Sequence, residues 1–209
     1  MRVKAIICDL DGTLVDTHQD YSIDIYSKGM KQLDKTFRKE HVNILCYDHK
    51  RNDFLKEYYC IDPEQFWQII NDIDDPNVRK NFIYAYKDTI VLPELCEEGY
   101  VLAIVTGAPK HVAKIEVELL GEKLFKYVVS ANPTHGLPRK PDPTGLEQCI
   151  KKLGIKPYEA IYLGNGHEDY ECAQNANVPF ILIDRQEFDT SIIPAQNRIT
   201  TLDELRKFV

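Results

Sequence analysis

The chain has 209 residues, of which 33 are acidic and 26 are basic, so its formal net charge at pH 7 is −7. This acidic balance argues against a protein that binds nucleic acid or an anionic membrane, because such proteins carry basic surfaces. The length suits one α/β domain with an insertion, or two small domains, and no apolar run in the sequence is long enough to span a membrane.

The first predicted element is a strand at Val3–Cys8, an apolar run without polar alternation. Such a run is typical of a strand that is buried on both faces of a parallel sheet. Two carboxylates, Asp9 and Asp11, follow it directly, with Gly12 and Thr13 next. Acidic residues at the carboxyl end of a parallel strand lie where open α/β sheets bind ligands. Capping would explain one aspartate, but two that can reach the same metal ion predict a functional site.

The stretch from Thr17 to Asp88 interrupts the pattern and contains no convincing buried strand. Its apolar residues recur at helical spacing, and Asp62-Pro63-Glu64-Gln65 has the acid, proline and glutamine that open a helix. We expect a small helical bundle that acts as a lid, because the insertion leaves after the first strand and returns before the second. Its two apolar helical faces comprise Tyr26, Met30, Leu33 and Phe37, and Phe66, Ile69, Ile70 and Ile73.

After the insertion, predicted strands and helices alternate. Alternation of this kind gives βαβ units with right-handed crossovers and a parallel sheet. We therefore predict an α/β, Rossmann-like core at residues 1–16 and 89–209, with a helical cap domain at residues 17–88. The later strands are predicted at Tyr100–Val105, Tyr127–Ser130, Ala160–Leu163 and Phe180–Ile183, and the helices near His111–Leu120, Thr144–Leu153, Glu168–Ala176 and Leu202–Phe208.

Three further groups of polar residues occur along the chain after the two aspartates. Thr106-Gly107 ends the strand that begins at Tyr100, Lys140 lies in Arg139-Lys140-Pro141-Asp142-Pro143, and Asn165 and Asp169 follow the strand at Ala160. Together with Asp9–Thr13, these groups resemble, in order, the four motifs of the haloacid dehalogenase (HAD) superfamily. The resemblance covers essentially the whole chain, and its layout is most similar to the phosphoglycolate phosphatase and β-phosphoglucomutase branch.

Phosphoryl transfer is the chemistry that this resemblance implies. Asp9 would be the nucleophile that forms an aspartyl phosphate. Asp11 would protonate the leaving oxygen and later accept a proton from the attacking water. The Thr106 hydroxyl and the Lys140 ammonium would hold the non-bridging phosphoryl oxygens. Loop amides around Gly12 and Gly107 would add substrate contacts.

A divalent cation is expected as well, because two carboxylates would repel an anionic substrate, and Mg²⁺ prefers hard oxygen ligands. The resemblance implies the Asp9 carboxylate, the Asp11 backbone carbonyl and oxygens of Asn165 and Asp169 as ligands. Asn165 departs from the family pattern, which usually has Asp there. The ligand set thereby loses one formal negative charge, so Mg²⁺ should bind more weakly unless Asp169 moves in.

The sequence accordingly predicts a cytoplasmic, Mg²⁺-dependent phosphatase that hydrolyses a small soluble phosphomonoester metabolite. The cytoplasmic location follows from cysteines without a Cys-x-x-Cys pair and from the absence of a signal-peptide pattern. A β-phosphoglucomutase-like phosphomutase and a catalytically weakened phosphate-binding or regulatory protein stay open as alternatives. His18 and Arg51 are the predicted substrate contacts within the insertion. The substrate and the oligomeric state are not fixed by the sequence.

Overall fold

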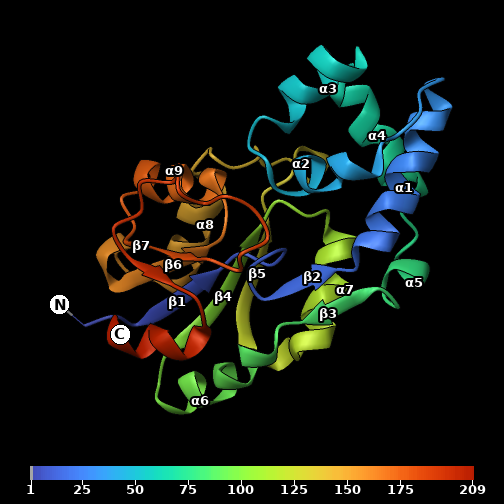
Figure 1. Cartoon of the computed structure of the whole chain (residues 1–209). Helices are drawn as coiled ribbons and strands as arrows, with labels where there is room; N and C mark the ends of the chain where they lie inside the picture. Colours follow the sequence, from blue (N-terminus) through green and yellow to red (C-terminus); the bar gives the residue numbers. More distant parts are fainter. Residues whose placement is uncertain (1) are drawn as a thin grey trace. The chain divides into compact units, whose positions relative to one another are not determined.

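The computed structural model describes residues 2–209, which divide into two compact units (Figure 1). The first unit contains the chain up to Asp16 and then Ala85–Val209, and the second contains Thr17–Tyr84. Residues 85–88, which the sequence analysis assigned to the insertion, lie in the first unit.

The first unit is built around a sheet in which every neighbouring pair of strands is parallel. Within the described residues, six strands occur in the order β5-β4-β1-β6-β7-β8, which confirms the predicted α/β fold class. The sixth strand was not predicted, since two residues are too short to show a pattern. The strands are β1 (Ala5–Cys8), β4 (Val101–Thr106), β5 (Phe125–Ser130), β6 (Ala160–Gly164), β7 (Phe180–Ile183) and β8 (Arg198–Ile199).

Helices pack on both faces of this sheet, because alternate residues of each strand point to opposite faces. Ile6 of β1 belongs to one apolar core, with residues of α6 (Val91–Glu97) and α7 (Lys110–Leu120). Ile7 belongs to the other core, with residues of α8 (Thr144–Leu153) and α9 (His167–Asn175). The strands β1, β6 and β7 are therefore buried on both faces, as their apolar runs predicted.

The second unit is mainly helical. Its helices bury a separate core that includes Met30, Phe66 and Ile70. Two short strands, which the sequence analysis did not predict, form a two-stranded sheet where the chain passes from one unit to the other. These elements are β2 (Val15–Thr17), α1 (Gln19–Gln32), α2 (Val42–Tyr47), α3 (Arg51–Tyr59), α4 (Pro63–Ile73), α5 (Pro76–Arg79) and β3 (Ile83–Ala85).

The sequence predicted the start of α4 correctly but not the end of α1. The Asp62 carboxylate accepts a hydrogen bond of 3.3 Å from the Gln65 amide, so the predicted cap of α4 is present. By contrast, α1 ends at Gln32, and Asp34 has a left-handed φ of 55°. Phe37 is therefore not on the predicted helical face, although its ring lies 5.7 Å from that of Tyr26.

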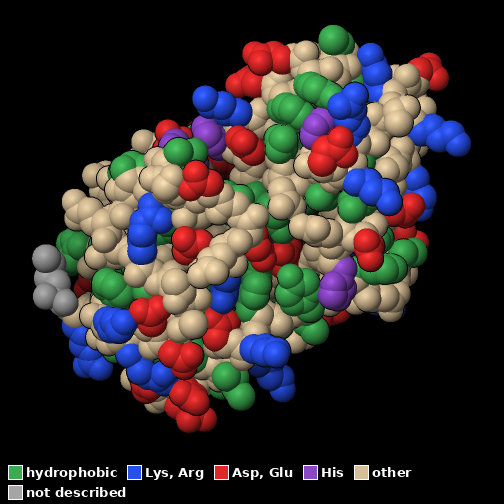
Figure 2. Space-filling view, in the orientation of Figure 1, with side chains coloured by type: hydrophobic (Ala, Val, Ile, Leu, Met, Phe, Trp, Pro, Cys, Tyr) green, Lys and Arg blue, Asp and Glu red, His purple; other side chains and the backbone are tan. Residues whose placement is uncertain are grey.

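The last helix of the chain differs in type from the prediction. The predicted C-terminal helix is a 3₁₀ helix at Leu202–Lys207 rather than an α-helix. None of the helices in residues 2–209 has the length and apolar character needed to cross a membrane. On the face drawn in Figure 2, acidic and basic side chains are interspersed.

Candidate active site

The first unit brings its predicted catalytic residues to one edge of the sheet. Asp9 follows β1, Thr106 ends β4, and Asn165 follows β6. Because β1 lies between β4 and β6 and all three strands are parallel, their carboxyl ends meet at the same edge.

Lys140 joins two buried carboxylates at this edge. Its Nζ atom lies 2.7 Å from Oδ1 of Asp9 and 2.5 Å from Oδ1 of Asp169. The side chains of Lys140, Asp9 and Asp169 are 7%, 8% and 4% exposed, respectively. Charges that are buried to this extent are tolerated only when they are paired and hydrogen-bonded. The contact brings together residues that are 131 and 29 positions apart in the sequence.

The pKa values at this cluster show a site rich in negative charge. The pKa of Asp9 is raised to about 7. Burial is the largest cause, the Lys140 ammonium acts in the opposite direction, and the negative charges of Asp169 and Asp11 add to the increase. For Lys140, burial alone would lower the pKa, but Asp169 and Asp9 hold it above the usual range. Lys140 therefore stays charged, whereas Asp9 needs further positive charge nearby to be fully ionised at neutral pH.

The turn after β1 packs directly against Asn165. Gly12 has a φ of +70°, and a Cβ atom built on it would lie 2.0 Å from Nδ2 of Asn165, so only glycine fits. The Thr13 hydroxyl donates a long hydrogen bond of 3.4 Å to Oδ1 of Asn165. The Arg185 guanidinium donates two hydrogen bonds to the Thr13 carbonyl oxygen, through Nη2 at 2.6 Å and through Nε at 3.2 Å. Arg185, which the sequence analysis did not single out, thus holds this turn.

The loop after β4 is held by two residues that the sequence analysis also missed. Asn132 donates through Nδ2 to the Gly107 carbonyl at 2.8 Å, and the Ser130 hydroxyl donates to the Ala108 carbonyl at 2.6 Å. The Thr106 hydroxyl oxygen accepts a hydrogen bond of 3.1 Å from the Ala108 amide. A Cβ atom on Gly107 would meet no atom within 4 Å, so there is open space beside this loop.

The chemistry of the oxygen donors decides whether this edge fits Mg²⁺. Both carboxylate oxygens of Asp169 already accept protein hydrogen bonds, Oδ1 from Lys140 and Oδ2 from the Gly166 amide at 3.0 Å. Residues 2–209 contain no group of three or more His, Cys, Asp or Glu side chains placed to hold a metal. The Asp9 carboxylate, the Asp11 carbonyl and the Asn165 amide oxygen are nevertheless hard donors of the kind that Mg²⁺ accepts, with waters and substrate oxygens completing its shell.

One residue of this cluster, Tyr162, was predicted only to lie in a strand and was not named as a site residue. Tyr162 lies in the middle of β6, and its hydroxyl is 2.9 Å from Oδ1 of Asp169 and 3.3 Å from Nζ of Lys140. An aromatic residue in an apolar strand gives no sequence signal of a polar contact, so only the folded chain reveals it.

The two predicted substrate contacts of the insertion lie in the second unit. The His18 ring is 4.9 Å from the Tyr84 ring. The Arg51 guanidinium donates to the Cys46 carbonyl at 3.2 Å and lies 5.7 Å from the centre of the Trp67 ring. Their role in binding substrate stays a prediction.

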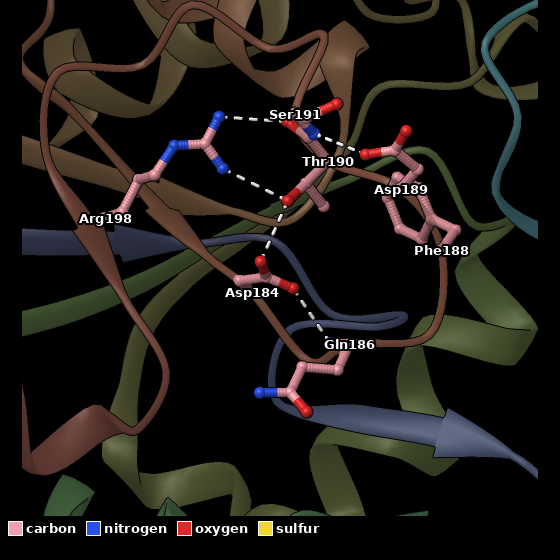
Figure 3. A pocket seen from close by; sticks show the side chains of 7 residues that line it. All are labelled: Asp184, Gln186, Phe188, Asp189, Thr190, Ser191 and Arg198. Atoms are coloured by element: carbon pink, nitrogen blue, oxygen red, sulfur yellow. Dashed lines mark hydrogen bonds between the residues drawn. The ribbon is translucent and has the colours of Figure 1, made fainter.

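A separate hollow of about 590 Å³ lies on the first unit and contains none of the predicted site residues (Figure 3). Its polar groups bond to one another. The Asp184 carboxylate accepts from the Gln186 amide and the Thr190 hydroxyl, both at 2.9 Å, and Arg198 donates to the Thr190 hydroxyl at 3.1 Å. We therefore assign this hollow to the packing of the loop after β7.

The raised pKa of Asp9 predicts a specific pH dependence of stability in metal-free protein. Between its ordinary value of 3.8 and about 7, the folded chain binds this proton more tightly than the unfolded chain. The contribution of Asp9 to the free energy of unfolding should therefore fall as the pH rises through this window. We expect the melting temperature of the wild type, relative to that of Asp9→Asn, to decrease from about pH 5 to about pH 8. A parallel course of the two proteins in EDTA would contradict it.

The chain is similar to known proteins along most of its length. Residues 6–183 match the family described as haloacid dehalogenase-like hydrolase. The chain is 25% identical to pyrophosphatase PpaX of Oceanobacillus iheyensis, over 100% of this chain and 96% of that protein. A HAD phosphatase from Thermococcus onnurineus has a TM-score of 0.70 and 26% identity, covering 98% of this chain and 97% of that one.

A chain described as a predicted phosphoglycolate phosphatase from Haemophilus somnus shares the fold. Its TM-score is 0.78 at 19% identity, over 99% of this chain and 98% of that one. The match over residues 6–183 spans the chain from β1 to β7, the insertion and all four groups of predicted site residues, and it confirms the resemblance drawn from the sequence. The chain therefore belongs to the haloacid dehalogenase-like hydrolase family.

Proposed function

We propose that this hydrolase is a Mg²⁺-dependent phosphatase that cleaves a small phosphorylated substrate through an aspartyl phosphate on Asp9. The observation that supports this most strongly is the contact of the Lys140 ammonium with Oδ1 of Asp9 at 2.7 Å. A buried carboxylate held by a fixed cation at the carboxyl edge of a parallel sheet is suited to attack phosphorus rather than to bind a neutral ligand.

Each residue would have a defined part in the reaction. Lys140 holds Oδ1 of Asp9, so Oδ2 attacks phosphorus while the bond from phosphorus to the leaving oxygen breaks, and Asp11 donates its proton to that oxygen. Asp11 then accepts a proton from water as the water oxygen attacks phosphorus and Asp9 is released. The Thr106 hydroxyl and the amides near Gly107 would bind the phosphoryl oxygens.

Mg²⁺ would be held by the Asp9 carboxylate, the Asp11 carbonyl and the Asn165 amide oxygen. When bound, it would partly neutralise the phosphoryl group and the cluster, in which Asp9 and Asp169 share the ammonium of Lys140 and Asp11 adds further negative charge near Asp9. Because both oxygens of Asp169 are hydrogen-bonded to protein donors, we assign Asp169 chiefly to holding Lys140 and only indirectly to the metal.

A phosphate-release assay can identify the substrate. The relatives named pyrophosphatase make inorganic pyrophosphate the first compound to test, and p-nitrophenyl phosphate and a panel of phosphorylated metabolites come next. The protein is assayed with Mg²⁺ and with EDTA, with Asp9→Asn as the control. Mg²⁺-dependent release of phosphate supports the proposal, and a requirement for a bisphosphate activator would indicate a mutase. Phosphate binding without turnover would indicate a regulatory protein.

We also propose that the insertion, residues 17–88, contributes the contacts that select the substrate. His18 and Arg51 are the first residues to replace, because each carries a polar group on the insertion. Loss of discrimination among substrates in His18→Ala or Arg51→Ala, with kcat for p-nitrophenyl phosphate retained, would support this role. An unchanged profile in both variants would place specificity elsewhere.

Asn165 allows a prediction that separates this chain from the family pattern. In Asn165→Asp, a carboxylate replaces the amide at almost the same volume. A new charge a few ångströms from Mg²⁺ contributes on the order of several kcal/mol before desolvation is subtracted, so we expect the half-saturating Mg²⁺ concentration to fall about tenfold. A magnesium titration of phosphatase activity and of thermal stability measures this.

The competing role for Asn165 is to pack against the turn that follows β1. Its side chain contacts Gly12 and accepts from the Thr13 hydroxyl, and this packing alone accounts for an asparagine. If the packing is its whole function, Asn165→Asp will lower stability and leave the apparent affinity for Mg²⁺ equal or weaker. That result would remove Asn165 from the ligand set.

A further inference from the structure

One buried hydroxyl connects separate parts of the site. Tyr162 of β6 is 0% exposed, and its hydroxyl oxygen lies 3.1 Å from the Val105 carbonyl oxygen. The same oxygen lies 2.9 Å from Oδ1 of Asp169 and 3.3 Å from Nζ of Lys140. Val105 directly precedes Thr106 at the end of β4, and β1 lies between β4 and β6. The Tyr162 side chain therefore spans β1 and links β4, Lys140 and Asp169.

The hydrogen-bond donors of Lys140 are fully used in this arrangement. An ammonium group has three N–H donors. Its three acceptors here are Oδ1 of Asp9, Oδ1 of Asp169 and the Tyr162 hydroxyl oxygen. Three contacts fix the position of Nζ, whereas the two carboxylates alone would leave it free to swing about the line that joins them.

The hydroxyl of Tyr162 also has acceptors for its own proton. A phenol carries one proton, and both remaining neighbours, the Asp169 carboxylate and the Val105 carbonyl, are acceptors. The rest of the side chain lies among apolar residues such as Ile7 and Leu182. A phenylalanine would fill this core equally well, and a buried hydroxyl is costly unless it is bonded. The polar part of Tyr162 therefore serves its contacts with the site.

We propose that Tyr162 is a positioning residue: its hydroxyl fixes the Lys140 ammonium and the Asp169 carboxylate relative to the end of β4 and thereby keeps Nζ against Asp9. This inference rests on the proposed phosphoryl-transfer function of that site. Without the hydroxyl, one N–H of Lys140 loses its acceptor and the ammonium can shift toward Asp169. A displacement of about 1 Å at a reacting group is enough to lower a rate about 100-fold.

Tyr162→Phe tests the proposal, with Tyr170→Phe as the matched control. Both rings contact Phe180, at centroid distances of 6.2 and 5.8 Å, but among the described residues no hydrogen bond is found for the Tyr170 hydroxyl. With p-nitrophenyl phosphate and Mg²⁺, we expect kcat of Tyr162→Phe to fall about 10- to 100-fold with KM changed less than about threefold. Tyr170→Phe should match the wild type. A lower melting temperature with unchanged kcat would show a purely structural role and overturn the proposal.

The ammonium group itself provides a second readout that needs no substrate. In protein labelled with ¹⁵N-lysine, an ammonium whose three N–H groups are all bonded exchanges slowly with water and gives a resolved signal. The signal is assigned to Lys140 by its loss in Lys140→Arg. We expect exchange to be about tenfold faster in Tyr162→Phe and unchanged in Tyr170→Phe.

Unchanged exchange in Tyr162→Phe would overturn the proposal whatever the kinetics show. The two readouts also separate this inference from the proposed function. If the wild type hydrolyses no phosphorylated compound, the proposed function fails, while the exchange measurement still decides whether Tyr162 positions Lys140.

Discussion

Purified Asp9→Asn protein should be folded and inactive. The change is nearly isosteric at the end of β1, and an amide oxygen can still accept the hydrogen bond that Lys140 donates at 2.7 Å. Packing and melting temperature should therefore change little, but the amide cannot attack phosphorus. We expect kcat with p-nitrophenyl phosphate or pyrophosphate to fall at least about 1,000-fold.

Circular dichroism and thermal unfolding establish that this variant is folded, and they make its kinetics interpretable. The control is Asp203→Asn, the same exchange at an exposed position of the first unit, which should keep wild-type activity. Turnover by folded Asp9→Asn within tenfold of the wild type would rule out Asp9 as the nucleophile.

Replacing Lys140 should have the second large effect, on both activity and stability. In Lys140→Met, the carboxylates of Asp9 and Asp169 lose the ammonium that contacts them at 2.7 and 2.5 Å. Removing one partner from a buried ion pair costs about 3–5 kcal/mol of unfolding free energy, because the remaining charges stay buried. Activity should fall at least about 1,000-fold, and Mg²⁺ should restore part of the stability by supplying positive charge.

Chemical unfolding with and without Mg²⁺ measures the stability, and Lys152→Met is the control. Lys152 is an exposed lysine of α8 whose ammonium lies 6.0 Å from the Tyr127 ring, so its replacement should leave activity unchanged. If Lys140→Met does not fold, the double variant Lys140→Met, Asp169→Asn carries one buried charge fewer and should recover folding without activity. Near-normal activity in either variant would contradict the role of Lys140.

The fold was predictable where burial leaves a strong pattern. Ala5–Cys8 and Phe180–Ile183 are apolar throughout, and they form strands of a parallel sheet that is covered on both faces. The short strands β3 and β8 were missed because three and two residues are too few to show a period. Phe37 was placed on a helix because its spacing fits, but a left-handed residue at Asp34 follows the end of α1.

The site residues were predictable where they belong to a motif of the family. They were not predictable where only the folded chain brings distant residues into contact. Asp9, Lys140 and Asp169 were all named from the sequence, and the structure brings them into direct contact. Arg185 and Tyr162 gave no such signal, since one is an ordinary charge after a strand and the other an ordinary aromatic within one. Their roles arise from hydrogen bonds across 172 and 22 positions of the sequence, respectively.

Rapid acid quench of a single turnover tests the central claim, an aspartyl phosphate on Asp9, most directly. The enzyme is mixed with Mg²⁺ and ³²P-labelled substrate, quenched during the first turnover, and digested so that the labelled peptide can be identified by mass spectrometry. The account predicts acid-stable, hydroxylamine-sensitive label on Asp9, and none in Asp9→Asn. Label on a different residue, or phosphate release by the wild type during which the Asp9 peptide never carries label, would contradict it.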